Sequence, residues 1–259
     1  MKRLSDGRTL SPAREIAAVA VMTALLIGGQ LAMSALVGVE VVTVLLLCFS
    51  WAFGPRAGAL AAVAFSLLRC FIWGFYPSAI VLYIIYYPLF ALTFGALGRA
   101  PQGVFKKFPV WAAVLTDVLI AAIACGAAVC AATDVLKISR LAVVMVKTLL
   151  WVVFALCCAL FAFFNTLIVL QRLGRLKREN TLKVAVLTAL ATLFTICFTL
   201  LDDVITPLFM GWGLFSASSA AYFYSNFIAL APQTVCTIVT VSVMFLPLSA
   251  IFLKAAKRT

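Results

Sequence analysis

Eight long apolar runs follow one another along this chain of 259 residues, and they limit its fold more than any other feature. A helix needs about 20 predominantly apolar residues to cross a bilayer. Short polar or basic segments separate the runs, which lie at roughly 15–37, 39–53, 57–74, 78–98, 110–132, 141–170, 183–201 and 232–253. Apolar types make up 66% of the residues and charged types 11%, so a water-soluble fold has no place for this much apolar surface. The sequence therefore predicts an all-α, polytopic transmembrane bundle of six to eight helices, with residues 1–259 as a single integral membrane domain.

Three of these runs leave the number and geometry of the crossings open. The second and third runs are short, and only Gly54-Pro55-Arg56 separates them. They form either two thin helices joined by a tight turn or one hairpin that does not cross fully. The sixth run would be about 45 Å long as a helix, so it must tilt strongly or project from the bilayer.

Basic residues are distributed unevenly between the segments that connect the runs. If the N-terminus is cytoplasmic, 16 of the 20 Lys and Arg side chains lie on the cytoplasmic side, which is the usual bias in membrane proteins. The first run follows Lys2, Arg3, Arg8 and Arg14 and is too long for a cleaved signal, so we interpret it as a retained helix. We therefore expect both termini in the cytoplasm and a multi-pass protein of the plasma membrane. The net charge of +12 then needs no nucleic-acid partner.

The sequence offers little for catalysis. It holds no histidine, which removes the commonest general base and the commonest transition-metal ligand. It contains no GxSxG, HExxH, Walker or kinase motif. The eight cysteines lie inside apolar runs without metal-ligand spacing, so we expect them to be small buried residues. We therefore expect no enzyme activity, no cofactor and no metal.

Three charged residues lie within the apolar runs, where a charge is costly and marks a functional candidate. Arg69, near the outer end of the third run, either grips an anionic or carbonyl-bearing ligand or extends to the outer headgroups. Asp117, in the inner half of the fifth run, either pairs with a Lys or Arg or binds a cation. Lys147, early in the sixth run, either meets Asp202, Asp203 or a ligand acid, or reaches the headgroups.

The segment from about Leu201 to Ala231 is too polar for a lipid-facing helix. We expect it to be partly re-entrant or to lie on the membrane surface, with Asp202 and Asp203 at a helix end. Aromatic residues are dense on the predicted outer side, where they form either an interfacial belt or a stacking surface for a flat ligand. The candidate substrate-binding residues are Glu40, Arg69, Trp73, Tyr76, Tyr83, Lys147, Asp203, Trp212, Tyr222, Tyr224 and Asn226.

Small residues form a stripe in the first run. Ala13, Ala17, Ala20 and Ala24 follow one another at steps of four, three and four residues, which places them on one helix face. Such a face lets another helix approach closely. The approaching helix belongs either to the same chain or to a partner subunit.

Three segments within the first hundred residues give the chain a family resemblance. They are Arg14-Glu15-Ile16-Ala17-Ala18-Val19-Ala20-Val21-Met22-Thr23-Ala24-Leu25, then Phe53-Gly54-Pro55-Arg56-Ala57-Gly58-Ala59-Leu60, then Phe94-Gly95-Ala96-Leu97-Gly98-Arg99. In this order and spacing they resemble the first helix, the turn between the second and third helices, and the end of the fourth helix of one family. These are the substrate-binding S components of energy-coupling factor (ECF) transporters, bacterial and archaeal importers of vitamins and micronutrients.

The resemblance implies a capture subunit that holds one substrate near the outer face of the membrane. It also implies a membrane coupling subunit and two cytosolic ATPases as partners, with the capture subunit toppling in the membrane to release its cargo. Carried over, Ala13, Ala17, Ala20 and Ala24 are the docking candidates, whereas the pocket residues vary with the substrate in this family. The family usually has six membrane helices, so either two of the eight runs are not full crossings or the chain is an enlarged variant.

The alternative is a stand-alone secondary transporter driven by protons or sodium, with Asp117 as the coupling carboxylate. The identity of the substrate stays open in both cases. The aromatic residues indicate a flat ring, and Arg69 and Lys147 indicate a carboxylate or phosphate. Folate, riboflavin, a cobalamin-like corrinoid or a queuosine precursor would each satisfy this description.

Overall fold

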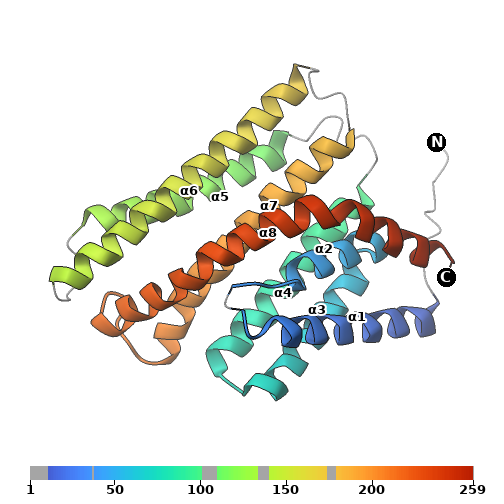
Figure 1. The fold of residues 1–259 in the computed structure, drawn as a ribbon, viewed down its shortest axis with the longest axis horizontal. Helices are drawn as coiled ribbons and strands as arrows, with labels where there is room; N and C mark the ends of the chain where they lie inside the picture. Colours follow the sequence, from blue (N-terminus) through green and yellow to red (C-terminus); the bar gives the residue numbers. More distant parts are fainter. Residues whose placement is uncertain (1–10, 37, 101–109, 134–139, 174–178, 259) are drawn as a thin grey trace. The chain divides into compact units, whose positions relative to one another are not determined.

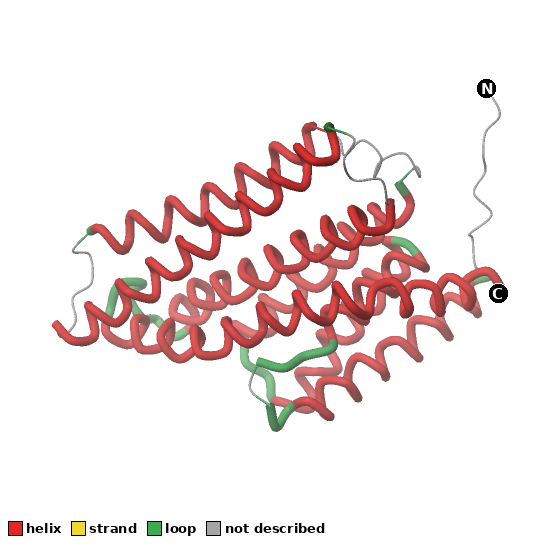
Figure 2. Tube along the Cα trace, turned by 45° about the horizontal axis from the view of Figure 1, so that its top comes forward, coloured by secondary structure: helices red, strands yellow, loops and turns green. Residues whose placement is uncertain are grey.

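The computed structural model describes residues 11–36, 38–100, 110–133, 140–173 and 179–258, and these ranges form helices and short connections without a strand. Figure 1 shows the helices in chain order, and Figure 2 shows how little of the described chain lies in loops. They are α1 (Pro12–Met33), α2 (Val42–Phe53), α3 (Pro55–Trp73), α4 (Pro77–Arg99), α5 (Val110–Ala132), α6 (Arg140–Arg172), α7 (Glu179–Phe209) and α8 (Ala217–Arg258). The predicted all-α, polytopic bundle is confirmed.

Seven of the described helices are long and apolar enough to cross a membrane. The exception is α2, whose 12 residues reach only about 18 Å of the about 30 Å hydrocarbon core. Ten of those 12 residues are buried, so α2 is a core element that protein surrounds rather than a lipid-facing crossing. The second and third runs are therefore two helices, joined at Gly54, whose φ of 92° suits glycine. The chain is a multi-pass membrane protein.

The chain forms two compact units. Unit 1 comprises residues 1–100 and 243–259, so its helices are α1 to α4 and the C-terminal part of α8. Unit 2 comprises residues 101–242, with α5, α6, α7 and the N-terminal part of α8. The candidate residues thus divide between two packed cores.

Unit 1 is built around the buried helix α2. The Phe49 ring meets Phe252 of α8 edge-on, with centroids 6.3 Å apart. The Trp51 ring meets Phe245 of α8 in the same way at 5.4 Å. Such edge-to-face pairs add to the stabilisation that burial gives. The end of α8 is therefore part of the core of unit 1.

The three segments that carry the family resemblance meet at one end of unit 1. Gly95 packs on the backbone of Gly54-Pro55 so closely that an added Cβ would lie 2.5 Å from the proline N and Cα. The guanidinium of Arg99 lies against the same turn. Arg56 Nε lies 3.5 Å from Glu15 Oε1, which links this turn to α1. Segments far apart in the sequence therefore form one contiguous structure.

Unit 2 has a core of small and branched side chains from four helices. The hydroxyl oxygens of Thr195 on α7 and Thr237 on α8 lie 3.0 Å apart, within hydrogen-bond distance. This contact gives both hydroxyl groups a hydrogen-bond partner inside the core, where neither water nor lipid can provide one. The apolar core consists of Ile120, Ala124, Ala127, Val153, Cys157, Leu193, Ile196 and Leu230.

The prediction for the segment 201–231 is wrong. Helix α7 continues through Asp202 and Asp203, and only residues 210–216 connect it to α8. The polar side chains that argued against a helix are hydrogen-bonded to one another, both along α7 and between α7 and α8. This pairing removes the cost of placing them in a membrane helix.

Candidate functional site

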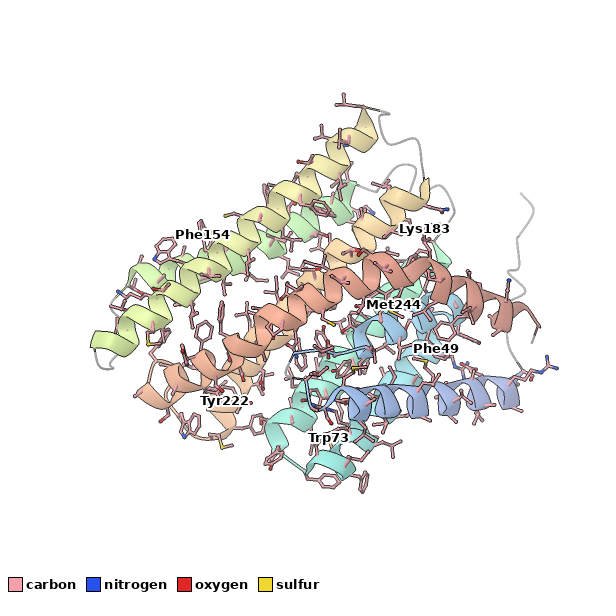
Figure 3. The ribbon with its side chains drawn as sticks, viewed as in Figure 1. Phe49, Trp73, Phe154, Lys183, Tyr222 and Met244 are labelled. Atoms are coloured by element: carbon pink, nitrogen blue, oxygen red, sulfur yellow. The ribbon has the colours of Figure 1, made fainter. Side chains whose placement is uncertain are left out.

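Arg69 lies in a cavity at the turn between α3 and α4 of unit 1. Arg69 and Trp73 are one helical turn apart on α3, and Tyr83 comes from α4. Gly74, with a φ of 105°, reverses the chain between the two helices. Figure 3 labels Trp73 at this end of the unit. The cavity, here called the Arg69 cavity, has a volume of about 260 Å³ and is lined by Arg69, Cys70, Trp73, Gly74, Tyr76, Ala79 and Tyr83.

Aromatic rings hold the Arg69 guanidinium inside this cavity. Its Cζ atom lies 4.0 Å from the centroid of the Tyr83 ring and 5.6 Å from that of Trp73. Both distances suit cation–π contacts. The Arg69 Nε is buried and has no hydrogen-bond partner among the described residues. An unsatisfied buried donor costs about 1–3 kcal/mol, so this nitrogen is an exception to the usual pairing of buried polar groups.

Glu40 lies in the connection before α2, close enough to Arg69 for an electrostatic interaction. Its Oε1 accepts a hydrogen bond of 2.7 Å from Thr43 Oγ1. Burial raises the pKa of Glu40 above its usual value of 4.5, although the Thr43 hydrogen bond and the Arg69 charge act in the opposite direction. When ionised, Glu40 partly offsets the charge that Arg69 presents to the cavity.

Five of the predicted substrate-binding residues thus gather in unit 1. Tyr87 joins them, and the sequence analysis missed it. Its ring centroid lies 5.7 Å from that of Tyr83, and its hydroxyl interacts electrostatically with Glu40 and Arg69. The signal for Tyr87 was its spacing, because it follows Tyr83 by one helical turn on α4. The five predicted residues are Glu40, Arg69, Trp73, Tyr76 and Tyr83.

The other predicted residues lie in unit 2, and several surround the Asp202-Asp203 pair on α7. Asp202 Oδ1 accepts a hydrogen bond of 2.8 Å from Thr206 Oγ1, which the sequence analysis did not single out. Asp202 Oδ2 accepts from the hydroxyl of Tyr222 at 2.8 Å and from Asn226 Nδ2 at 3.1 Å. Asn226 Nδ2 also donates to Asp203 Oδ1 at 2.9 Å. Tyr222 lies near the start of α8, as Figure 3 shows.

Trp212, Tyr224 and Lys147 are placed less centrally. The Trp212 ring meets the Tyr222 ring edge-on at 6.5 Å, so it packs beside the network. Tyr224 is exposed. The two carboxylates, with which Lys147 was one candidate to pair, accept hydrogen bonds from Thr206, Tyr222 and Asn226.

Asp117 on α5 is hydrogen-bonded to an amide side chain of α6. Asn165 Nδ2 on α6 donates to Asp117 Oδ1 at 3.0 Å, and it also donates to the carbonyl of Phe161 at 3.0 Å. Among the described residues, Asp117 is therefore paired with an amide, whereas the two alternatives from the sequence were a Lys or Arg and a bound cation. An amide donor satisfies the carboxylate without a second buried charge.

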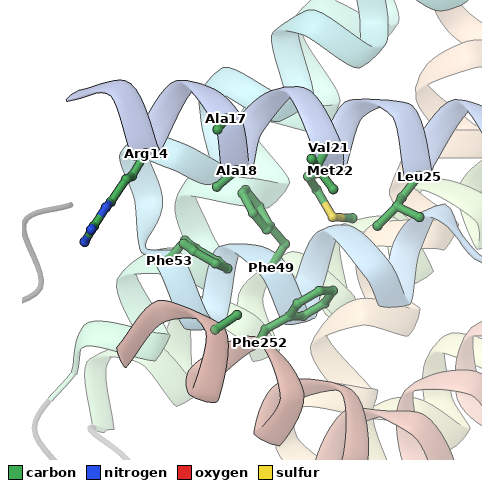
Figure 4. A pocket seen from close by; sticks show the side chains of 10 residues that line it. Arg14, Ala17, Ala18, Val21, Met22, Leu25, Phe49, Phe53 and Phe252 are labelled. Carbon is green, nitrogen blue, oxygen red and sulfur yellow. The ribbon is translucent and has the colours of Figure 1, made fainter. Parts of the chain in front are cut away.

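The small-residue stripe on α1 is exposed along its whole length, since Ala13, Ala17, Ala20 and Ala24 are all accessible. The opposite face of α1 is buried in unit 1. A groove of about 320 Å³ runs beside the stripe between α1, α2 and the end of α8 (Figure 4). Its lining is apolar except for Arg14. Within unit 1, the described helices therefore leave the stripe accessible.

No family model matches the chain, and neither does any curated protein or solved structure.

Proposed function

We propose that the protein is the substrate-capture subunit of an ECF-type importer of a vitamin or related micronutrient, and that the Arg69 cavity binds the substrate. The observation that carries this proposal is a guanidinium with an unsatisfied Nε in a cavity walled by aromatic rings. A charged side chain in a membrane helix is energetically costly and usually marks a functional site. An anionic ligand would accept a hydrogen bond from the Arg69 Nε and neutralise the guanidinium charge.

The substrate class that fits this cavity is a small, flat anion. A guanidinium binds a carboxylate or phosphate with two parallel hydrogen bonds. Trp73, Tyr76 and Tyr83 offer ring surfaces for stacking. The volume of about 260 Å³ lies just below the range of about 300–1,000 Å³ that is usual for small-molecule sites. We therefore expect one anionic ring in the cavity, with larger substituents outside it.

The partners proposed are a membrane coupling subunit and two cytosolic ATPases in the plasma membrane. The exposed alanine stripe on α1 supports this, because helices associate in lipid through close contacts between small residues. The sequence contains no nucleotide-binding loop of its own, so the energy would come from those ATPases. The basic segments mark the cytoplasmic side, which puts the turn between α3 and α4 at the outer face.

Glu40 makes anion binding depend on pH. Because its pKa lies above 4.5, lowering the pH through that pKa neutralises Glu40 while Arg69 stays charged. We expect benzenesulfonate, a flat ring with a permanent negative charge, to bind more tightly as the pH falls. At pH values above the pKa of Glu40, the Glu40→Gln variant should bind it more tightly than the wild type does, and the variant should lose the pH dependence. Equilibrium dialysis of the protein in detergent measures both effects.

The neutral analogue benzenesulfonamide is the control ligand for this experiment. Its affinity should not change with the Glu40→Gln substitution, because it carries no charge for Glu40 to repel. Weaker benzenesulfonate binding at lower pH, or an unchanged pH profile in the variant, would show that Glu40 does not act on the cavity.

The ion-coupled alternative depends on Asp117, and we expect Asp117→Asn to leave uptake unchanged. The Asn side chain keeps an oxygen that accepts the hydrogen bond from Asn165. Uptake of the compound that purifies with the protein, measured in cells with and without a proton or sodium gradient, tests this. Loss of uptake in the variant together with loss on collapse of the gradient would favour the secondary transporter.

A further inference from the structure

A second cavity lies in unit 2, and the sequence analysis did not locate it. It has a volume of about 360 Å³ and lies among α5, α6, α7 and α8. Most of its lining is apolar, and Asp203 is its one acidic residue. We call it the Asp203 cavity, and its lining residues are Ile123, Gly126, Ala127, Cys130, Val146, Leu150, Leu200, Asp203, Val204, Leu214, Phe215, Ser219, Ala220 and Phe223.

The two neighbouring carboxylates of α7 have different surroundings. Asp202 has hydrogen bonds on both oxygens, from three donors, and it does not line the cavity. Asp203 receives a hydrogen bond on Oδ1 from Asn226, and its Oδ2 receives none from the described residues. Asp202 therefore ties α7 to α8, whereas Asp203 keeps an acceptor oxygen for a ligand in the cavity.

The lining of the cavity indicates the charge and shape of that ligand. A carboxylate in a mostly apolar space is costly unless a cation or a strong donor meets it. Lys147 is not among the lining residues, although its neighbour Val146 is. Phe215 and Phe223 provide ring faces and apolar surface that suit an ammonium group attached to a hydrocarbon or aromatic body.

We propose that the Asp203 cavity binds a protonated amine with an apolar body, through the free oxygen of Asp203 and the surrounding apolar walls. This site shares no residue with the Arg69 cavity and takes a ligand of the opposite charge. It does not depend on the function proposed for unit 1. The volume of about 360 Å³ suits a ligand with one or two rings.

The test compares two radiolabelled probes of the same shape on the full-length protein in detergent. They are 2-(1-naphthyl)ethylamine, which is protonated at neutral pH, and the neutral 2-(1-naphthyl)ethanol. The wild-type protein should bind the amine at least about tenfold more tightly than the alcohol, because only the amine forms a charge-assisted hydrogen bond. The Asp203→Asn variant keeps an acceptor for Asn226 and should bind both probes equally. Asp202→Asn is the matched control and should keep the preference for the amine.

A cavity-blocking variant makes the test independent of the charge change. Val204 lines the cavity and is 45% exposed, so Val204→Trp should fold and exclude both probes. Equal binding of amine and alcohol to the wild-type protein would overturn the proposal and indicate an apolar cleft for lipid. Unchanged amine binding in Val204→Trp, or a preserved preference in Asp203→Asn, would also overturn it. If Asp203→Asn does not fold, the preference of the wild type for the amine and the binding measured with Val204→Trp decide whether the proposal holds.

Discussion

Replacing Gly95 with alanine is expected to destabilise unit 1 by about 1–3 kcal/mol or more, since overpacking costs that much when the neighbours cannot move. The new Cβ would lie 2.5 Å from backbone atoms of Pro55, at the start of α3. A flexible side chain would give way, but a backbone at a helix start would have to shift with its whole helix. Thermal unfolding of the purified protein in detergent should show a clear drop in Tm.

Gly28→Ala is the matched control for this prediction. Gly28 lies in the interior of α1, and no atom lies within 4 Å of the position of an added Cβ. Alanine is preferred to glycine inside a helix by up to about 1 kcal/mol, so this variant should be as stable as the wild type or slightly more stable. Equal Tm values for the two variants would contradict the tight packing of α4 on the turn after α2.

Replacing Arg69 with glutamine is expected to abolish selective binding of benzenesulfonate. A hydrogen bond to a charged group contributes about 1.5–3 kcal/mol, so its loss should weaken binding by roughly 10- to 150-fold. Arg69→Lys keeps the charge but loses the planar group that stacks on Tyr83. Its affinity for benzenesulfonate should therefore lie between that of the wild type and that of Arg69→Gln. Dialysis against benzenesulfonate and benzenesulfonamide measures the effect on the anion separately from the effect on the ring.

Arg56→Gln controls for the loss of one positive charge. The Arg56 side chain is 80% exposed and pairs with Glu15, away from the Arg69 cavity. This variant should keep the wild-type affinity, because exposed ion pairs contribute little. If Arg69→Gln binds benzenesulfonate as well as Arg56→Gln does, the Arg69 cavity is not an anion site.

Helices were predictable from the sequence where apolar residues are continuous. The run at 110–132 coincides with α5, and the long sixth run became the 33-residue helix α6. The hydrophobic requirement of the bilayer fixes such elements locally, without reference to the rest of the chain. Glu40, Arg69 and Tyr83 were expected to lie on the same outer side of the membrane, but not to contact one another. Hydropathy contains no information on which side chains touch.

Polar residues inside helices were the main source of error. The segment with Asp202, Tyr222 and Asn226 was expected to be partly re-entrant or to lie on the membrane surface, because a helix with these residues is unfavourable in lipid by itself. The structure pairs them between α7 and α8, and a tertiary contact of this kind cannot be read from local composition. The same reason hid the Asp203 cavity, which requires four helices to meet. The short helix α2 was uncertain for a related reason. Its 12 residues are too few to cross the membrane, and only their burial in protein explains how so short an apolar helix is accommodated.

Native mass spectrometry of the protein, extracted gently in detergent from its own membranes, tests the central proposal most directly. The proposal predicts a complex with a membrane coupling subunit and two ATPases, together with a bound small molecule that carries a flat ring and a negative charge. The bound molecule should be lost from the Arg69→Gln variant while the complex remains. A protein that is isolated alone, without ligand or ATPases, under conditions that preserve other membrane complexes, would contradict the proposal.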